Sequence, residues 1–413
     1  MVRSSKFMAI AAALAMALGI PGVGSAAQVV KIGNIIPLSG PSAPVGVQGK
    51  NAREMAVQQI NAAGGIKSLG GAKLKMIYAD SKSDPTTGVS EAERLINSNK
   101  VNLLTGCWNS AVTYPTTQVA ERYGIPFVVP VSVADTITAR GFKNVFRLAA
   151  KDSWWTRDQF RFLKDMMKEY KVPVKTVAFV YENGDWGTGF AKGWAKLAKE
   201  AGYKVVLNEP YPSTSPDLTP VVLKIKAAHP DVLFMCSNAA DAILLTNGLH
   251  DLDVHPKAII TSGGGNADPS FLANAGDNAV GEFDIVEWNS DFNKPGVKET
   301  NAKFKKLYGY DMSGEAVDAY ASMYVIKDAL EKAGSLDPAK IRHALATIRV
   351  KSTGPLSLLS YPSVKFDKTG QNENAGLVVV QVAKINGKLE RVTVWPKAVR
   401  HAGYHPVFPM SAK

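Results

Sequence analysis

The sequence contains few of the residues that carry metal or redox chemistry. Its 413 residues include two cysteines, Cys107 and Cys236, and six histidines. No histidine stands in an H-E-x-x-H pattern or in a Cys/His arrangement typical of zinc sites, so we expect no metal site. Each cysteine follows an apolar run in a different half of the chain. We therefore expect two free, partly buried thiols that fill core space.

Sequence patterns typical of enzymes are also missing. The chain has no G-x-x-x-x-G-K-[ST] phosphate loop and no G-x-S-x-G nucleophile elbow. Gly187-Thr188-Gly189 is followed by Gly193, one residue too far along for the dinucleotide fingerprint G-x-G-x-x-G. These absences predict no cofactor and no catalysis. A Rossmann-like enzyme is the weaker alternative.

Basic residues outnumber acidic ones, but they do not cluster. The net charge is +12, and no run of Lys or Arg is interleaved with aromatic residues. A protein that binds nucleic acid presents such a basic patch. We therefore expect a solvated basic surface and no nucleic-acid partner.

The one long apolar run lies at the N-terminus, where Arg3 and Lys6 precede residues 7–20 and Pro21 follows. This run is short for a transmembrane helix, which needs about 20 residues. Charged, apolar and small residues in this order are typical of a signal peptide, with Ser25 and Ala27 at the cleavage site. We expect removal of residues 1–27 and a soluble periplasmic protein. No cysteine stands there to take a lipid, so a lipoprotein is not expected.

Short β-rich runs alternate with helical patterns along the rest of the chain, which predicts an α/β fold with parallel sheets. The remaining length exceeds what one hydrophobic core supports, so two lobes are expected. The loops after the strands are rich in Ser, Asn, Asp and Gly and contain Trp108 and Trp186. Such loops form ligand sites in open parallel sheets, although the same residues also cap helices and make turns. The expected strands cover residues 29–37, 74–79, 101–105, 126–131, 176–181, 204–207, 231–236 and 258–261.

With these elements in order, the chain resembles the leucine/isoleucine/valine-binding family of periplasmic receptors. The resemblance covers nearly the whole chain after residue 27 and depends on many collinear short motifs, each weak alone. The motifs are Ile32-Gly33, Leu38-Ser39-Gly40-Pro41, Ile60-Asn61, Gly64-Gly65-Ile66, Asp80 with Asp84-Pro85, Ser110 with Pro115, Tyr123-Gly124-Ile125-Pro126, Ile137 to Gly141, Phe146-Arg147 and Trp186-Gly187.

The resemblance implies a type I periplasmic-binding-protein fold, in which two doubly wound parallel-sheet lobes are joined by three crossing segments. The first lobe is expected at 28–148 plus 285–352, and the second at 149–284 plus 353–413, including a C-terminal extension. The crossings are expected near 148–152, 281–288 and 352–364. The implied protein is a monomer without enzymatic activity. It closes on a small molecule and delivers it to an ABC permease and ATPase complex of the inner membrane.

The same resemblance supplies candidate site residues. Ser110 matches a serine that holds the ligand carboxylate at a helix N-terminus. Val131 matches a residue whose carbonyl faces the ligand ammonium. Val133 stands where the family has a threonine, which neighbouring Ser132 could replace. Trp186 and Asn238 stand near cleft tyrosines of the family. Further candidates are Trp108, Asn109, Trp154, Asp241 and Gly264.

One departure from the family bears on the ligand. Amino-acid-binding members place a glutamate for the ligand ammonium where this chain has Gly263, Gly264 and Gly265. Since a buried ammonium without an anionic partner is costly, either Asp241, Asp268 or another acid replaces that glutamate, or the ligand has no amine. We therefore expect a branched-chain amino acid or a related carboxylate or amide, with an aromatic or 2-oxo acid lacking an amine as the alternative. Together with Val133 in place of a threonine and Trp186 in place of a tyrosine, the missing glutamate favours an aromatic or branched carboxylate, or an amide, over a free aliphatic amino acid.

Overall fold

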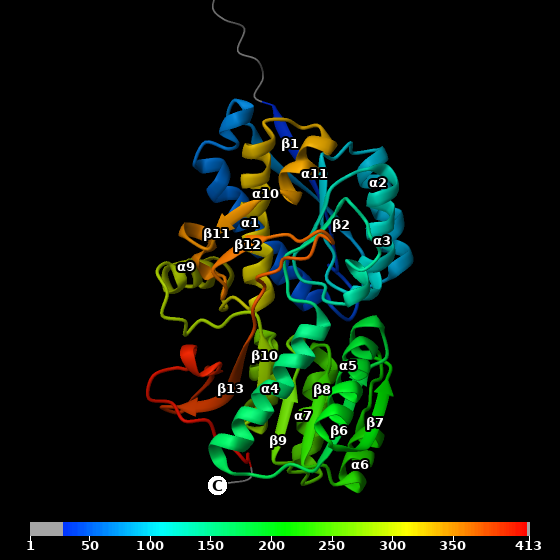
Figure 1. Cartoon of the computed structure of the whole chain (residues 1–413), viewed down its shortest axis with the longest axis vertical. Helices are drawn as coiled ribbons and strands as arrows, with labels where there is room; N and C mark the ends of the chain where they lie inside the picture. The colour runs from blue at the N-terminus through cyan, green and yellow to red at the C-terminus, as the bar shows by residue number, and fades with distance from the viewer. Residues whose placement is uncertain (1–27, 411–413) are drawn as a thin grey trace, which may run out of the picture.

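The computed structural model of the chain describes residues 28–410, so the expected signal peptide, residues 1–27, lies outside the described residues. Figure 1 shows two α/β lobes arranged along the long axis of the molecule. In the described part of the chain, no helix is both long enough and apolar enough to cross a membrane.

The first lobe is built on a parallel sheet of five strands in the order β2-β1-β3-β4-β5. Two buried apolar clusters lie on its two faces, one with α1 and α10 and the other with α2 and α3. A short antiparallel pair, β11 and β12, adds to the first of these clusters. The strands are β1 (Val29–Ile36), β2 (Lys73–Asp80), β3 (Leu103–Gly106), β4 (Phe127–Val129), β5 (Val145–Arg147), β11 (Arg349–Lys351) and β12 (Ser363–Lys365). The helices are α1 (Ala43–Ala62), α2 (Pro85–Asn97), α3 (Ser110–Tyr123), α9 (Val297–Tyr308), α10 (Gly314–Ala333) and α11 (Pro338–Ala346).

The second lobe contains a sheet of seven strands in the order β14-β13-β10-β9-β8-β6-β7. Its five strands from β10 to β7 are parallel as expected, but β13 and β14 are antiparallel and extend one edge. The strands are β6 (Thr176–Glu182), β7 (Lys204–Tyr211), β8 (Val232–Cys236), β9 (Ala258–Thr261), β10 (Phe283–Val286), β13 (Val378–Ile385) and β14 (Lys388–Trp395). The helices are α4 (Asp152–Tyr170), α5 (Asp185–Ala201), α6 (Thr219–Ala228), α7 (Ala239–Asp251) and α8 (Pro269–Ala275). Cys107 and Cys236 are buried free thiols, one in each lobe.

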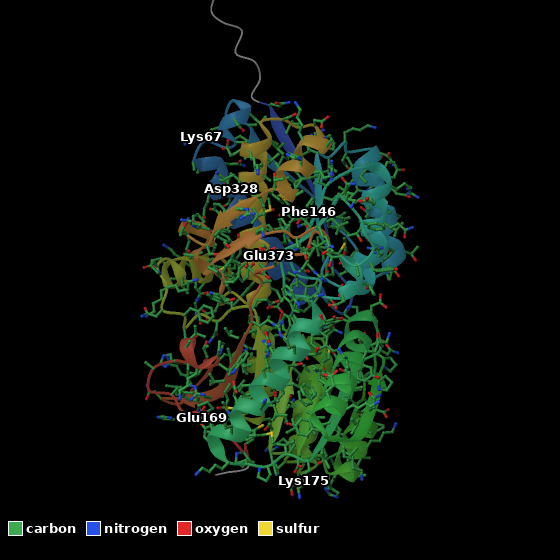
Figure 2. The ribbon with its side chains drawn as sticks, viewed as in Figure 1. Lys67, Phe146, Glu169, Lys175, Asp328 and Glu373 are labelled. Atoms are coloured by element: carbon green, nitrogen blue, oxygen red, sulfur yellow. The ribbon has the colours of Figure 1, made fainter. Side chains whose placement is uncertain are left out.

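Three segments join the lobes, and one of them differs from its expected position. The first crossing follows β5 and ends at α4, and the second follows β10. The third lies later than the expected 352–364, because Leu356, Leu358 and Val364 are buried in the core of the first lobe. It runs from about residue 373 to β13, and Figure 2 shows Glu373, at its start, between Phe146 of the first lobe and Glu169 of the second.

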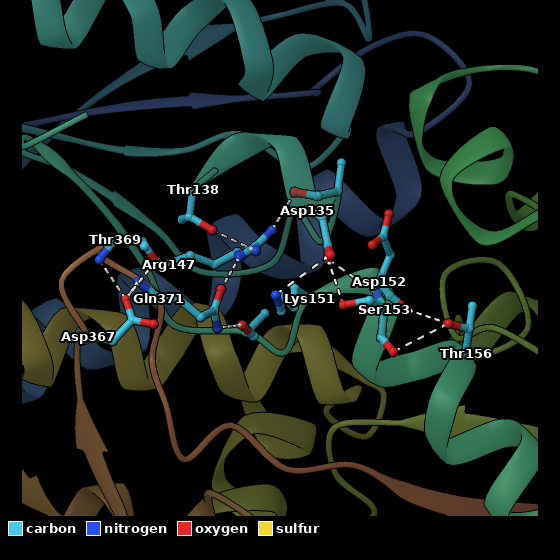
Figure 3. Close-up of polar contacts among 12 residues, drawn as sticks. Asp135, Thr138, Arg147, Lys151, Asp152, Ser153, Thr156, Asp367, Thr369 and Gln371 are labelled. Carbon is cyan, nitrogen blue, oxygen red and sulfur yellow. Dashed lines mark hydrogen bonds and ion pairs between the residues drawn. The ribbon is translucent and has the colours of Figure 1, made fainter. Parts of the chain in front are cut away.

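A buried arginine ties the first crossing to the third. The Arg147 guanidinium, with no solvent exposure, donates to Gln371 Oε1 at 2.6 Å and to the Ala134 carbonyl at 2.7 Å. Gln371 in turn donates to the Ala149 carbonyl, and Asn372 donates to the Leu148 carbonyl. Figure 3 shows Arg147, Gln371 and the neighbouring Asp135 and Asp152 at this junction. The first crossing is therefore hydrogen-bonded to the segment that leads directly into the third.

The lobes are closed against each other. Gln48 of α1 donates to Asp268 at 2.7 Å, and Ser42 donates to Asn238 at 3.4 Å. The Gly264 N–H of the second lobe donates to Glu315 of α10 at 3.0 Å. Each bond links a first-lobe residue to a second-lobe residue, so these contacts exist only while the lobes are together.

Candidate functional site

A cavity of about 340 Å³ lies between the two lobes and is lined by both. Because it lies beyond the carboxyl ends of the parallel strands, it occupies the position where such sheets bind ligands. All the candidate residues from the sequence line it except Trp154 and Asp241. The lining candidates are Trp108, Asn109, Ser110, Val131, Ser132, Val133, Trp186, Asn238 and Gly264.

Ser110 opens helix α3, whose N-terminus faces the cavity. The first N–H groups of a helix have no acceptor within it and carry its positive pole, so they attract an anion. The Asn109 side chain does not cap this helix; its amide donates to Ser42 Oγ at 2.8 Å. The first turn of α3 contains no acidic residue. This end of the cavity is therefore suited to a carboxylate, held by backbone N–H groups and the Ser110 hydroxyl.

The segment from Val131 to Val133 forms the adjoining wall. The Ser132 hydroxyl donates to the Trp108 carbonyl at 2.8 Å and also contacts the Thr113 hydroxyl. The Val133 carbonyl accepts the Asp152 N–H at 2.8 Å. Since the Ser132 hydrogen is used within the protein, this hydroxyl mainly holds the wall in place.

An aromatic wall comes from Trp108, Trp155 and Trp186. Trp155 donates to the Ala150 carbonyl at 3.1 Å, and its ring meets Phe190 edge to face at 6.1 Å, as the Trp186 ring does from another side. Trp154 does not line the cavity, because its ring lies near the Lys151 and Arg157 cations instead. Adjacent helix positions face directions about 100° apart, so only one residue of this pair can face inward.

Gly264 is required by Trp186. A Cβ built on Gly264 would lie 2.4 Å from the Trp186 ring, and the residue has φ of +55°, which favours glycine. The indole therefore occupies the space into which a side chain at position 264 would project. A glutamate at position 264 would therefore clash with the indole.

Neither of the two acids named from the sequence lines the cavity. Asp241 accepts the Tyr211 hydroxyl at 2.7 Å, and burial raises its pKa to about 6. Asp268 caps α8 and accepts the Gln48 amide. Both carboxylates therefore bond to other protein groups around the cavity.

Four other acids do line the cavity, and sequence reasoning did not name them as site residues: Glu182, Asp185, Glu287 and Glu315. Glu182 accepts the N–H groups of Gly184 and Gly187, each at 2.7 Å. Glu287 is buried, and neither of its carboxylate oxygens has a hydrogen-bond partner among the described residues. Burial raises the pKa of Glu315 to about 7 and the pKa of Glu287 well above its ordinary value. Residues 28–410 contain no group of three or more His, Cys, Asp and Glu side chains that could hold a metal ion.

Comparisons with known proteins agree with this architecture. A family model described as periplasmic binding protein matches residues 29–388. The Leu/Ile/Val-binding protein homolog 7 of Brucella suis biovar 1 is 32% identical over 399 residues, which cover 94% of this chain and 96% of that protein.

Solved structures share the fold. The leucine-binding protein LivK from Thermotoga maritima superposes with a TM-score of 0.76 at 20% identity, covering 90% of this chain and all of that one. A solute-binding protein of an ABC transporter from Rhodopseudomonas palustris, in complex with 3,4-dihydroxybenzoic acid, has a TM-score of 0.77 at 21% identity, covering 88% and 96%. The expected type I fold is thus confirmed. The chain belongs to the periplasmic binding protein family, whose members are substrate-binding proteins of transporters and not enzymes.

Proposed function

We propose that this protein is the substrate-binding component of an ABC importer and that it captures a small organic acid in the cavity between its lobes. It acts in the periplasm as a monomer, after removal of a signal peptide that ends near Ala27. Its partners are the small-molecule ligand and the permease and ATPase complex of the inner membrane. The names of the relatives, which include leucine-binding and ABC solute-binding proteins, support this role.

The observation that carries the proposal is that the N-terminus of α3, which has no acid in its first turn, faces the cavity between the lobes. A ligand carboxylate at this end accepts hydrogen bonds from the backbone and from Ser110, while its apolar body contacts the tryptophan wall. Val131, Ser132 and Val133 shape the adjoining wall, and Asn238 faces it from the second lobe.

Closure supplies the signal to the transporter. A ligand that contacts both lobes binds the closed form more tightly than the open form and shifts the population toward it. The hydrogen bonds from Ser42 to Asn238 and from Gln48 to Asp268 add to the closed form. A permease that recognises the closed surface then takes up substrate only from loaded protein.

Two ligand classes fit the cavity. The first is a branched-chain amino acid or a related small carboxylate or amide. The second is an aromatic or 2-oxo acid without an amine, which Trp108, Trp155 and Trp186 favour because they offer broad apolar surfaces.

A thermal-shift screen tests the proposal. Leucine, isoleucine, valine, their 2-oxo acids, simple amides and aromatic acids are added singly to the purified protein, and calorimetry follows on those that raise Tm. A true ligand stabilises the folded state by mass action. If a ligand raises Tm but is converted chemically at catalytic protein concentrations, a pure binding role is contradicted.

A further inference from the structure

Two carboxylates form one wall of the cavity, at the hinge. Glu287 is the first residue after β10, at the start of the second crossing, and Glu315 lies in the first turn of α10. Both side chains line the cavity, and both residues are at most 4% exposed.

Neither carboxylate is neutralised by the protein. Glu315 accepts the Gly264 N–H, while neither Glu287 carboxylate oxygen has a hydrogen-bond partner among the described residues. Within residues 28–410, no ion pair includes Glu287 or Glu315. Leaving ionised carboxylates buried without a cation is costly.

The ionisable groups around this pair are mostly acids, whose pKa values burial raises. Asp318 comes from α10, Asp284 from β10, and the neutral Tyr361 from the segment before β12. Arg391 of β14 is a cation close enough to feel the charge of Glu315, but its guanidinium donates to the backbone carbonyls of Asn266 and Asp268. Capping of α10 does not explain the pair, because Ser313 Oγ already accepts the Ala316 N–H at 3.2 Å.

The helix N-termini around the cavity give it two electrical poles. Helices α5, α7 and α10 each carry an acid in the first turn, whereas α1 and α3 carry none. The positive ends of α1 and α3 are therefore left for an anion, while Glu287 and Glu315 bring carboxyl groups to the hinge side that a cation would ionise.

We propose that Glu287 and Glu315 form a subsite for a protonated nitrogen of the ligand, an ammonium or an amidinium, while its carboxylate lies at the N-terminus of α3. This inference rests on the proposed function and narrows its ligand class. Trp186 excludes an acid at position 264, and the negative charge instead reaches the same glycine from α10, through the bond from Gly264 N–H to Glu315. The missing glutamate of the second lobe is thus replaced by acids from the crossing and the first lobe.

Binding of a cation is coupled to the release of a proton. The pKa of Glu315 is raised to about 7 by burial, so near neutral pH this carboxyl is partly protonated. A cationic nitrogen favours the ionised form and lowers that pKa. Affinity for such a ligand increases as the pH rises through 7, by up to about tenfold per pH unit for each proton released.

The test is calorimetry on a matched panel. Leucine, phenylalanine and arginine are compared with the 2-oxo acids of leucine and phenylalanine, on each side of neutral pH and in two buffers of different ionisation enthalpy. We expect the nitrogen-bearing probes to bind more tightly than their 2-oxo partners and to release protons. Arginine separates an amidinium-type ligand from a simple ammonium.

Two variants locate the effect. Glu315→Gln and Glu287→Gln should each weaken the best nitrogen-bearing probe by at least about tenfold, and each should reduce the number of protons released. Glu282→Gln is the matched control, because Glu282 is equally buried and has a raised pKa, of about 8, but bonds to Thr246 and does not line the cavity. It should leave both quantities unchanged.

The calorimetry distinguishes failure of the subsite from failure of the proposed function. If the 2-oxo acids bind in a Ser110-dependent way and the nitrogen-bearing probes do not, the subsite is refuted and the proposed function stands. Tight binding of an amino acid that neither glutamine variant weakens also refutes the subsite. If no member of the panel binds, the subsite and the proposed capture of a small carboxylate both fail.

Discussion

Replacement of Ser110 by alanine is the sharpest test of the carboxylate end of the cavity. The side chain is 3% exposed, and its hydroxyl oxygen accepts the Ala134 N–H at 3.2 Å. Its hydrogen is therefore available for a ligand oxygen. A hydrogen bond to a charged group contributes about 1.5 to 3 kcal/mol, which corresponds to a roughly 10- to 150-fold loss of affinity.

The loss should be partial, because the backbone N–H groups at the start of α3 remain. The same variant leaves the Ala134 N–H without its acceptor, which costs about 1 to 3 kcal/mol of stability. Binding and folding must therefore be measured separately, by calorimetry for Kd and by urea unfolding for the free energy of unfolding. Ser110→Thr keeps the hydroxyl and is the matched variant, since it should retain more affinity than Ser110→Ala.

Proton release on binding gives a second readout. Because Ser110 lies at the opposite pole from the two glutamates, Ser110→Ala should weaken binding without changing the number of protons released. An unchanged Kd for the ligand, together with a normal unfolding transition, would remove Ser110 from the site and refute the assignment of the carboxylate to α3.

Three further predictions concern the frame around the site. Burial and Asp135 raise the pKa of Asp152 to about 8. Between about pH 4 and 8 the folded state therefore keeps a proton that the unfolded chain loses, so the free energy of unfolding falls as the pH rises through this range. Asp152→Asn should therefore stabilise the protein above about pH 8 in urea unfolding, and equal stability there would contradict the shift. Gly264→Ala should lower the free energy of unfolding by about 1 to 3 kcal/mol and change the tryptophan fluorescence, because the new Cβ meets Trp186. Unfolding and fluorescence like those of the wild type would be evidence against that clash. Arg147→Met should destabilise the protein by at least about 2 kcal/mol, since it leaves Gln371 and the Ala134 carbonyl unpaired. An unchanged urea midpoint would show that the Arg147 hydrogen bonds do not stabilise this junction.

The fold was predictable because it follows from local patterns. Alternating strands and helices predicted parallel sheets, and the resemblance to the receptor family implied two doubly wound lobes with a first crossing near 148–152, where the chain leaves β5. The third crossing was misplaced at 352–364, a range that contains the pair Gly354-Pro355. A Gly-Pro pair marks a turn wherever it stands, and here it begins a short helical turn whose Leu356 and Leu358 pack into the first lobe.

The cavity walls were predictable where they follow strands. The carboxyl ends of parallel strands meet at one edge, so Ser110, Ser132 and Asn238 come together despite their separation in the chain. The choice between Trp154 and Trp155 depends on the rotation of α4, which the sequence alone does not specify.

Glu287 and Glu315 could not be predicted as site residues, for a different reason. Glu287 follows β10, a short strand that had not been expected, and Glu315 opens a helix of the other lobe. Only closure of the lobes brings Glu315 to Gly264. A search for one replacement acid near position 264 in the chain therefore could not find it.

A crystal structure of the protein with the tightest-binding member of the panel tests the central claim most directly. We predict one ligand molecule in the cavity between closed lobes, with its carboxylate within hydrogen-bond distance of the Ser110 N–H and hydroxyl and its nitrogen beside Glu287 and Glu315. A ligand bound outside this cavity, or one whose carboxylate lies away from α3, would contradict the account.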